Sequence, residues 1–468
     1  MHGRLAPCEE WDMSDQNAPQ SPEWRSAHEG HGIHPAHQGS SPFQRLAERL
    51  TYLSNSRRWR VARNGILAGL LAGAVTCAYR FMISEATAFA RNAYAFIGDH
   101  PATIAGFFAA AIVVAALIWI VVRRVPESSG SGIPQVKGLI QGDSPMRPGR
   151  VLGARFLGGG AAAIFGLSLG REGPSIQLGA AAAQLLGRPL RATPEEERHL
   201  LTSGAAAGLS AAFNAPVSGL MFGIEGLHKS FSPLVIASAA TGALAADVIA
   251  SLVFGSEPVL QFGAVGTVPI GLLWAVLPLG LVAGLLGALF NKILLASQNL
   301  QELPGPFPIL LALGLALPCG LFFPLALGGG EKAIKWAEFG AASVGAVLIL
   351  LLVKTAFTAV SFGAGIPGGI FMPILAIGTL TGASYALILQ HLGFSAGYQA
   401  ALAVCGMAGL LAATVRTPLT SILLTAEMTG SLSHLLPVAT VVIIAIFVAD
   451  ALRVPPIYDA LLERSRKH

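Results

Sequence analysis

Long apolar stretches dominate the chain, and they are about as long as a bilayer is thick. Residues Thr103–Val122 and Pro269–Phe290 are uninterrupted apolar runs of about 20 residues, the length that a transmembrane helix needs. They show no alternation of apolar and polar positions, which excludes the strands of a membrane β-barrel. The pattern predicts an all-α polytopic membrane protein.

Short segments rich in Gly and Pro break the apolar stretches. These segments read SSGSGIP, GLSLGREGP, FNAPVSG, FGAGIPGGIFMP and VRTPLTS. In hydrocarbon the backbone groups at such a break have no water to bond, so breaks survive only where protein buries them or where they line a cavity. We therefore expect half-helices that end inside the membrane. Their N-terminal ends favour an anion.

The breaks recur in an internal repeat. The matching pairs are Gly130–Gly132 with Gly328–Gly330, Gly170–Pro174 with Gly369–Pro373, Ala207–Ala212 with Ala408–Ala413, Pro216 with Pro418, and Glu225 with Glu427. Every pair is displaced by 198 to 202 residues. Paired broken segments in two halves indicate a transporter with its site near the midplane. We predict a first membrane repeat over 64–262 and a second over 263–452.

Composition and charge agree with this prediction. Hydrophobic residues make up 53% of the chain and charged residues only 12%, against about 25% charged in soluble domains. A water-soluble globule and a disordered chain are both excluded. Positive charge gathers in segments 45–63 and 453–468, and such charge marks the cytoplasmic side. We expect both termini in the cytoplasm, a location in the cell (inner) membrane, and no binding of nucleic acid, because these arginines adjoin hydrocarbon.

The N-terminal segment 1–44 is polar and has no apolar core region, so it is not a secretory signal peptide. Its histidines are spaced by three residues: His28, His31, His34 and His37. They either bind metal or stand by chance in a disordered tail, and we expect the disordered cytoplasmic tail. Segment 45–63 is predicted to be a basic amphipathic helix on the membrane surface. No motif indicates a cofactor, and the four scattered cysteines predict no disulfide framework.

Three of the breaks resemble the signature motifs of the CLC family of chloride channels and chloride/proton antiporters. They are Gly130–Pro134 (GSGIP), Gly170–Pro174 (GREGP) and Gly369–Pro373 (GxFxP), and Tyr458 resembles the family's late tyrosine. The resemblance covers about residues 60–468. It implies a CLC-type inverted repeat with broken half-helices, and a homodimer in the lipid bilayer with one pathway in each subunit.

The resemblance also implies a set of chloride-binding groups. They are the hydroxyls of Ser131 and Tyr458 and the backbone N–H groups near Gly132, Ile370 and Phe371. Such neutral donors suit an ion that must leave as well as bind. The alternatives are close helix packing at Ser131 and an interfacial aromatic anchor at Tyr458. Ser131 favours chloride, with bromide and nitrate also accepted.

Glu172 is the first candidate for proton chemistry. A carboxylate within an apolar break is costly and is a functional candidate by default. In the family the matching glutamate is the gate. Ionised, it occupies an anion position, and protonated it swings out and admits chloride, which couples the two ions. The alternative is a salt bridge with Arg171.

The chain departs from the family pattern at a second acidic position. Coupled antiporters of the family commonly carry a cytoplasm-side proton glutamate in an IEE stretch, which here reads Ile224, Glu225, Gly226. Glu225 could relay protons instead, or it could share a structural role, such as helix-end hydrogen bonding, with its repeat mate Glu427. The resemblance therefore predicts chloride/proton exchange, with a passive chloride channel or a partly uncoupled transporter as the alternative.

Two further expectations concern what the chain does not do. The stretch Gly166–Gly170 matches the GxSxG pattern of hydrolases, but that pattern needs a strand-to-helix turn that an all-helical context does not offer. We therefore expect no enzyme. The chain ends ten residues after Tyr458, so we expect a bacterial-type member without CBS domains.

Overall fold

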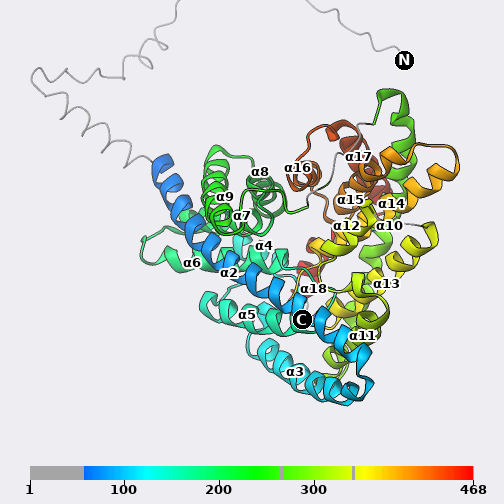
Figure 1. The fold of residues 1–468 in the computed structure, drawn as a ribbon. Helices are drawn as coiled ribbons and strands as arrows, with labels where there is room; N and C mark the ends of the chain where they lie inside the picture. The colour runs from blue at the N-terminus through cyan, green and yellow to red at the C-terminus, as the bar shows by residue number, and fades with distance from the viewer. Residues whose placement is uncertain (1–56, 261, 263–267, 340–342, 467–468) are drawn as a thin grey trace, which may run out of the picture. The chain divides into compact units, whose positions relative to one another are not determined.

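The computed structural model describes residues 57–260, 262, 268–339 and 343–466, and these residues form helices almost throughout (Figure 1). The predicted tail 1–44 and residues 45–56 of the predicted amphipathic segment lie outside the described residues. Residues 57–63 are the first turns of α2, a long helix that continues to Asp99. The predicted boundary between 262 and 263 adjoins residues that are not described, and it stays a prediction.

The helices follow the breaks that the sequence marks. From the N-terminus the elements are α2 (Arg57–Asp99), η2 (Pro101–Thr103), α3 (Ile104–Arg124), η3 (Pro126–Ser128), α4 (Ile133–Gln141), α5 (Pro148–Ile164), α6 (Glu172–Gly187), α7 (Pro194–Phe213), α8 (Pro216–Met221), η4 (Phe222–His228) and α9 (Pro233–Phe254). The later elements are η5 (Ile270–Ala275), α10 (Val276–Ser297), η6 (Gln298–Glu302), α11 (Phe307–Phe322), η7 (Pro324–Ala326), α12 (Glu331–Phe339), α13 (Val344–Gly363), α14 (Phe371–His391), η8 (Ala396–Tyr398), α15 (Gln399–Val415), α16 (Pro418–Thr429), α17 (Leu435–Ala451) and α18 (Ile457–Ser465). Many begin with Pro in the first turn, where its missing N–H costs nothing.

The packing of the helices repeats between the two parts of the chain. Helix α2 packs on α7 and α9, and α10 packs on α15 and α17 in the same way. Likewise α6 packs on α7 as α14 packs on α15. The short helices α4 and α12, nine residues each, follow the Gly-rich turns of the two halves. The predicted all-α fold of two homologous halves with broken half-helices is confirmed.

By length and composition, seven of the described helices could cross a membrane. They include α3 and α10, which contain most of the two apolar runs that stand out in the sequence. Helices α14 and α15 belong to this set too, yet they are largely buried within the protein. The interior therefore consists of apolar helices surrounded by other apolar helices.

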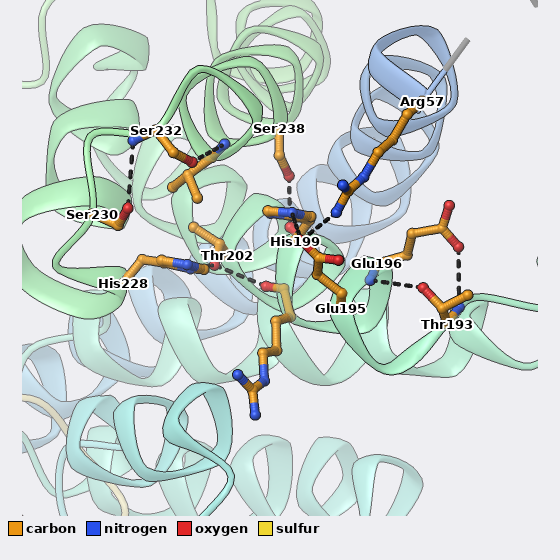
Figure 2. Close-up of polar contacts among 12 residues, drawn as sticks. Arg57, Thr193, Glu195, Glu196, His199, Thr202, His228, Ser230, Ser232 and Ser238 are labelled. Carbon is orange, nitrogen blue, oxygen red and sulfur yellow. Dashed lines mark hydrogen bonds and ion pairs between the residues drawn. The ribbon is translucent and has the colours of Figure 1, made fainter.

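The start of α7 is fixed by its own cap and by α2 (Figure 2). The Thr193 hydroxyl accepts a hydrogen bond from the backbone N–H of Glu196 (3.3 Å), and the Glu196 carboxylate accepts one from the backbone N–H of Thr193 (3.0 Å). This reciprocal capping box satisfies two backbone donors of the helix end. Glu195 also forms an ion pair with Arg57, at the start of α2.

Two glutamates tie the halves together by capping helices of the opposite half. Glu225 of η4 accepts hydrogen bonds from the backbone N–H groups of Leu419 and Thr420 (3.1 and 2.8 Å), at the start of α16. In return Glu427 of α16 accepts hydrogen bonds from the backbone N–H groups of the second and third residues of α8 (3.0 and 2.7 Å). The exchange is the symmetric helix-end role that the repeat suggests for these two residues.

We expect Glu225→Ala and Glu427→Ala to destabilise the protein to a similar degree. Each change leaves two backbone donors and a hydroxyl without their carboxylate, so the free energy of unfolding should fall by about 1–3 kcal/mol. Denaturant unfolding of the purified protein in detergent measures this loss. Glu463→Ala, at an exposed position of α18, is the control and should change little. A loss confined to one of the two variants would contradict the reciprocal capping.

Candidate functional site

The starts of α6 and α14 meet at the centre of the repeat. Gly170 and Gly369 exchange backbone hydrogen bonds in both directions, with N···O distances of 2.6 and 2.8 Å. These glycines occupy matching positions of the two repeats, so the contact is symmetric between the two halves. Glu172 is the first residue of α6 and Phe371 the first residue of α14. Two helix N-termini, both favourable to anions, therefore converge here.

The turn before α4 lies against the same centre. Gly132 adopts φ +89°, a left-handed conformation that favours glycine, and caps α4. A Cβ on Gly173 would lie 2.7 Å from the Ser131 carbonyl oxygen and 3.3 Å from the Cα of Gly369. The structure thus brings Ser131 close to Gly173 of the second motif and Gly369 of the third.

Ser131 and Tyr458 carry buried hydroxyl groups that lie close to each other. Their residues are 2% and 4% exposed, and neither hydroxyl has a hydrogen-bond partner among the described residues. Helix α18, which carries Tyr458, packs on α4. Its Asp459 forms ion pairs with Lys137 of α4 and, at 3.0 Å, with Lys229. The acidic neighbour of Tyr458 thus fixes the helix that presents it.

Glu172 is 1% exposed, and its Oε2 atom has no hydrogen-bond partner among the described residues. It lines a cavity of about 270 Å³ together with parts of α2, the 324–335 segment and Met372 of α14. Arg171 lines the cavity too, and its Nε lies 3.9 Å from Glu172 Oε1. That distance is too long for a hydrogen bond. The salt bridge considered from the sequence is therefore present, but as a long ion pair without a hydrogen bond.

The cavity lies far from the start of α2 along this helix. Its lining includes Ile83 and Arg91 of this helix, which lie about 40 and 50 Å along the axis from Arg57 at about 1.5 Å per residue. The hydrocarbon core of a bilayer is only about 30 Å thick. Glu172 lines this cavity from the start of α6.

Two fully buried cations support the Gly-rich turns, and the sequence analysis did not single them out. Arg155 of α5 donates to the Gly130 carbonyl (2.6 Å), and Lys354 of α13 donates to the Gly328 carbonyl (2.6 Å). Both cations are 0% exposed, and they stand 199 residues apart, at matching places of the repeat. The available signal was a basic residue within an apolar run, which is a functional candidate by default.

Arg155 also places positive charge behind the Ser131 turn. Its Nε hydrogen-bonds Gln177 Oε1, and its Nη2 has no hydrogen-bond partner among the described residues. A Cβ on Gly132 would lie 2.7 Å from that Nη2. The guanidinium therefore favours an anion at the start of α4 while its own charge is met by protein oxygens.

Gly226 lies under an aromatic ring. A Cβ at this position would lie 2.8 Å from the Phe222 ring, and Phe222 is fully buried with its ring edge-on to Phe371 (centroids 5.8 Å apart). Glu225, next to it, has both carboxylate oxygens engaged at the start of α16. The structure therefore does not bring a carboxylate of this segment to the side of Glu172.

Ser168, the central residue of the GxSxG match, is buried and hydrogen-bonded within the protein. It is 0% exposed, and its hydroxyl shares a 2.7 Å hydrogen bond with Thr358. The described residues around it include no strand that could form a nucleophile turn. Among the described residues, moreover, no group of three or more His, Cys, Asp or Glu side chains could hold a metal ion.

Comparison with known proteins agrees with the motifs. The family model described as voltage gated chloride channel matches residues 113–450. The H(+)/Cl(-) exchange transporter ClcA of Klebsiella pneumoniae is 36% identical over 413 residues, covering 85% of this chain and 87% of that protein. The protein of the same name from Salmonella typhi is 34% identical over 415 residues, covering 85% and 87%. The crystal structure of a slow cyanobacterial Cl-/H+ antiporter superposes with a TM-score of 0.81 at 31% identity, covering 87% of this chain and 98% of that one.

Gly173→Ala should disturb the convergence of the three motifs. The added Cβ would meet the Ser131 backbone at 2.7 Å, and such overpacking costs about 1–3 kcal/mol. Thermal unfolding in detergent should show a lower melting temperature. Gly153→Ala in α5 is the matched control, because nothing lies within 4 Å of its Cβ position and alanine suits a helix interior. Equal melting temperatures for the two variants would refute this close approach.

Proposed function

Because the chain belongs to the voltage-gated chloride channel family, we propose that it is a chloride/proton exchange transporter with Glu172 as its gate. One observation carries the proposal: a carboxylate that is 1% exposed lies where two helix N-termini converge and lines a cavity with several charged residues. The relatives' names, H(+)/Cl(-) exchange transporter, support the same pair of ions. The members of this family named above are channels and transporters.

The chloride path we propose uses neutral donors supported by one buried cation. The hydroxyls of Ser131 and Tyr458 and the backbone N–H groups at Ile370 and Phe371 bind the ion. Arg155 adds positive potential from behind the Ser131 turn. Chloride thus meets no cation in direct contact that would hold it too tightly to leave.

Glu172 couples the two ions because its carboxylate and chloride compete for the same helix N-termini. Ionised, the carboxylate lies at the starts of α6 and α14 and excludes chloride, as an anion does at a helix N-terminus. Protonated, it loses that attraction and turns into the cavity, where the proton can leave to water. Each exchange of chloride for carboxylate then moves a proton along the same path in the opposite direction.

Conduction without protons is the second candidate function, and the Phe222 ring over Gly226 favours it. At the position of the family's inner proton glutamate this segment has Gly226, which lies against the Phe222 ring and offers a proton no group to bind. Protons on the cytoplasmic side would then reach Glu172 only through water. If they do not, the same fold is a passive chloride channel or a partly uncoupled transporter.

We further propose that the protein is a homodimer in the cell (inner) membrane with both termini cytoplasmic. Arg57, Arg58, Arg60 and Arg63 lie at the start of α2, and this positive charge supports a cytoplasmic position for that end. Large apolar side chains are exposed along α9 and α17, for example Leu252 and Phe447. Such faces are suited to lipid or to a second subunit.

The deciding experiment measures chloride and proton movement in liposomes that contain the purified protein. With an imposed chloride gradient and no proton gradient, we expect the wild type to move protons against chloride. Glu172→Gln removes the titratable group, so proton movement should fall to background while chloride still passes. External pH and chloride electrodes record both ions.

Glu463→Gln, at an exposed position of α18, is the control and should transport as the wild type does. Chloride flow without proton movement in the wild type would reject exchange. The protein would then be a passive chloride channel or an uncoupled transporter. Proton movement that persists in Glu172→Gln would remove this residue from the gate.

A further inference from the structure

The guanidinium beside the gate is paired with a different carboxylate. Arg171 Nη2 lies 2.8 Å from Glu331 Oε1, whereas Arg171 Nε lies 3.9 Å from Glu172 Oε1. The Arg171 side chain is only 8% exposed, and its Nε has no hydrogen-bond partner among the described residues. The cation next to Glu172 therefore makes its short contact with Glu331 and only a long ion pair with Glu172.

The backbone at Glu331 is held in place by neighbouring residues. It is the first residue of α12, and the turn before it is held by Lys354, whose Nζ donates to the Ala326 and Gly328 carbonyls (2.9 and 2.6 Å). Its own side chain is 42% exposed toward the cavity. The backbone that carries the carboxylate is thus anchored from the protein interior, while the carboxylate itself reaches the cavity.

The cavity offers Arg171 few other partners. Its acidic lining residues are Glu172 and Glu331, and its other charged lining residues are the cations Arg91, Lys332 and Lys335. Arg80, from the same face of α2, is engaged by Asn214 and the Ala211 carbonyl. Without the Glu331 carboxylate, the nearest acidic partner for Arg171 in this cavity is the gate itself.

The repeat shows that this charge cluster is not part of the common framework. The residues at matching positions of the other half are Ile370 for Arg171, Phe371 for Glu172 and Ile133 for Glu331. All three are apolar. The ion pair is therefore an addition on one face of the membrane, at the gate, and not a contact that both halves need to fold.

We propose that Glu331 is a positioning residue that holds Arg171 away from Glu172 and so leaves the gate free to move. This inference rests on the proposed role of Glu172 as the gate. Glu331 itself contacts neither chloride nor the transferred proton. It acts by occupying a guanidinium that would otherwise hold the ionised Glu172 in its closed position by a charge-assisted hydrogen bond.

Glu331→Gln should slow transport in the otherwise wild-type protein but not in the Glu172→Gln background. We expect the chloride efflux rate from liposomes to fall about tenfold, the effect of a hydrogen bond between charged groups. Glu331→Asp keeps a carboxylate and should retain most of the rate. The loss in Glu331→Gln should shrink as external pH is lowered, because a protonated Glu172 carries no charge for Arg171 to hold.

Lys332→Gln is the control for charge alone. It changes the potential of the cavity without removing the partner of Arg171, so it should slow the wild-type protein much less than Glu331→Gln does. An unchanged or faster chloride efflux rate in Glu331→Gln would overturn the proposal. An equal loss of rate in the Glu172→Gln background would overturn it too, because a folding defect would produce that result. If Glu172 is not the gate, the Glu172→Gln variant without any other change will still move protons. That result distinguishes a failure of the proposed function from a failure of this inference.

Discussion

The pair of backbone hydrogen bonds between Gly170 and Gly369 is the contact on which the central arrangement depends. It joins the starts of α6 and α14, so that two helix N-termini face one small region. The approach leaves no room for side chains: a Cβ on Gly369 would lie 3.0 Å from the backbone nitrogen of Gly173. The concentration of glycine in the motifs thus follows from the need to bring polar backbone groups together inside hydrocarbon.

Buried charge supports this arrangement from both halves. A cation in the membrane interior is expensive unless oxygen atoms surround it. Arg155 and Lys354 find those oxygens in the carbonyls of the turns that precede α4 and α12. Each cation holds one Gly-rich turn in place, and that turn sets the direction of the short helix that follows it. Arg155 stands behind the Ser131 turn, where an anion benefits from its charge, whereas Lys354 secures the turn that carries Glu331.

The sequence predicted the parts of this structure that leave a regular trace. Matching breaks at a constant displacement predicted the two halves, and the match of Glu225 with Glu427 suggested their shared helix-end role. The Arg155 and Lys354 contacts could not be predicted, because the carbonyls they bind come from turns more than 20 residues away. The pairing of Arg171 with Glu331 likewise depends on tertiary packing that no local pattern records.

The exchange of caps between Glu225 and Glu427 has the form of an isologous interface, in which one surface meets a copy of itself. Within a single polypeptide, such reciprocity is what the duplication and fusion of a gene for a self-pairing ancestor would leave behind. Either half alone would present a helix start without its carboxylate and a carboxylate without its helix. A second copy related by a two-fold axis satisfies both at once.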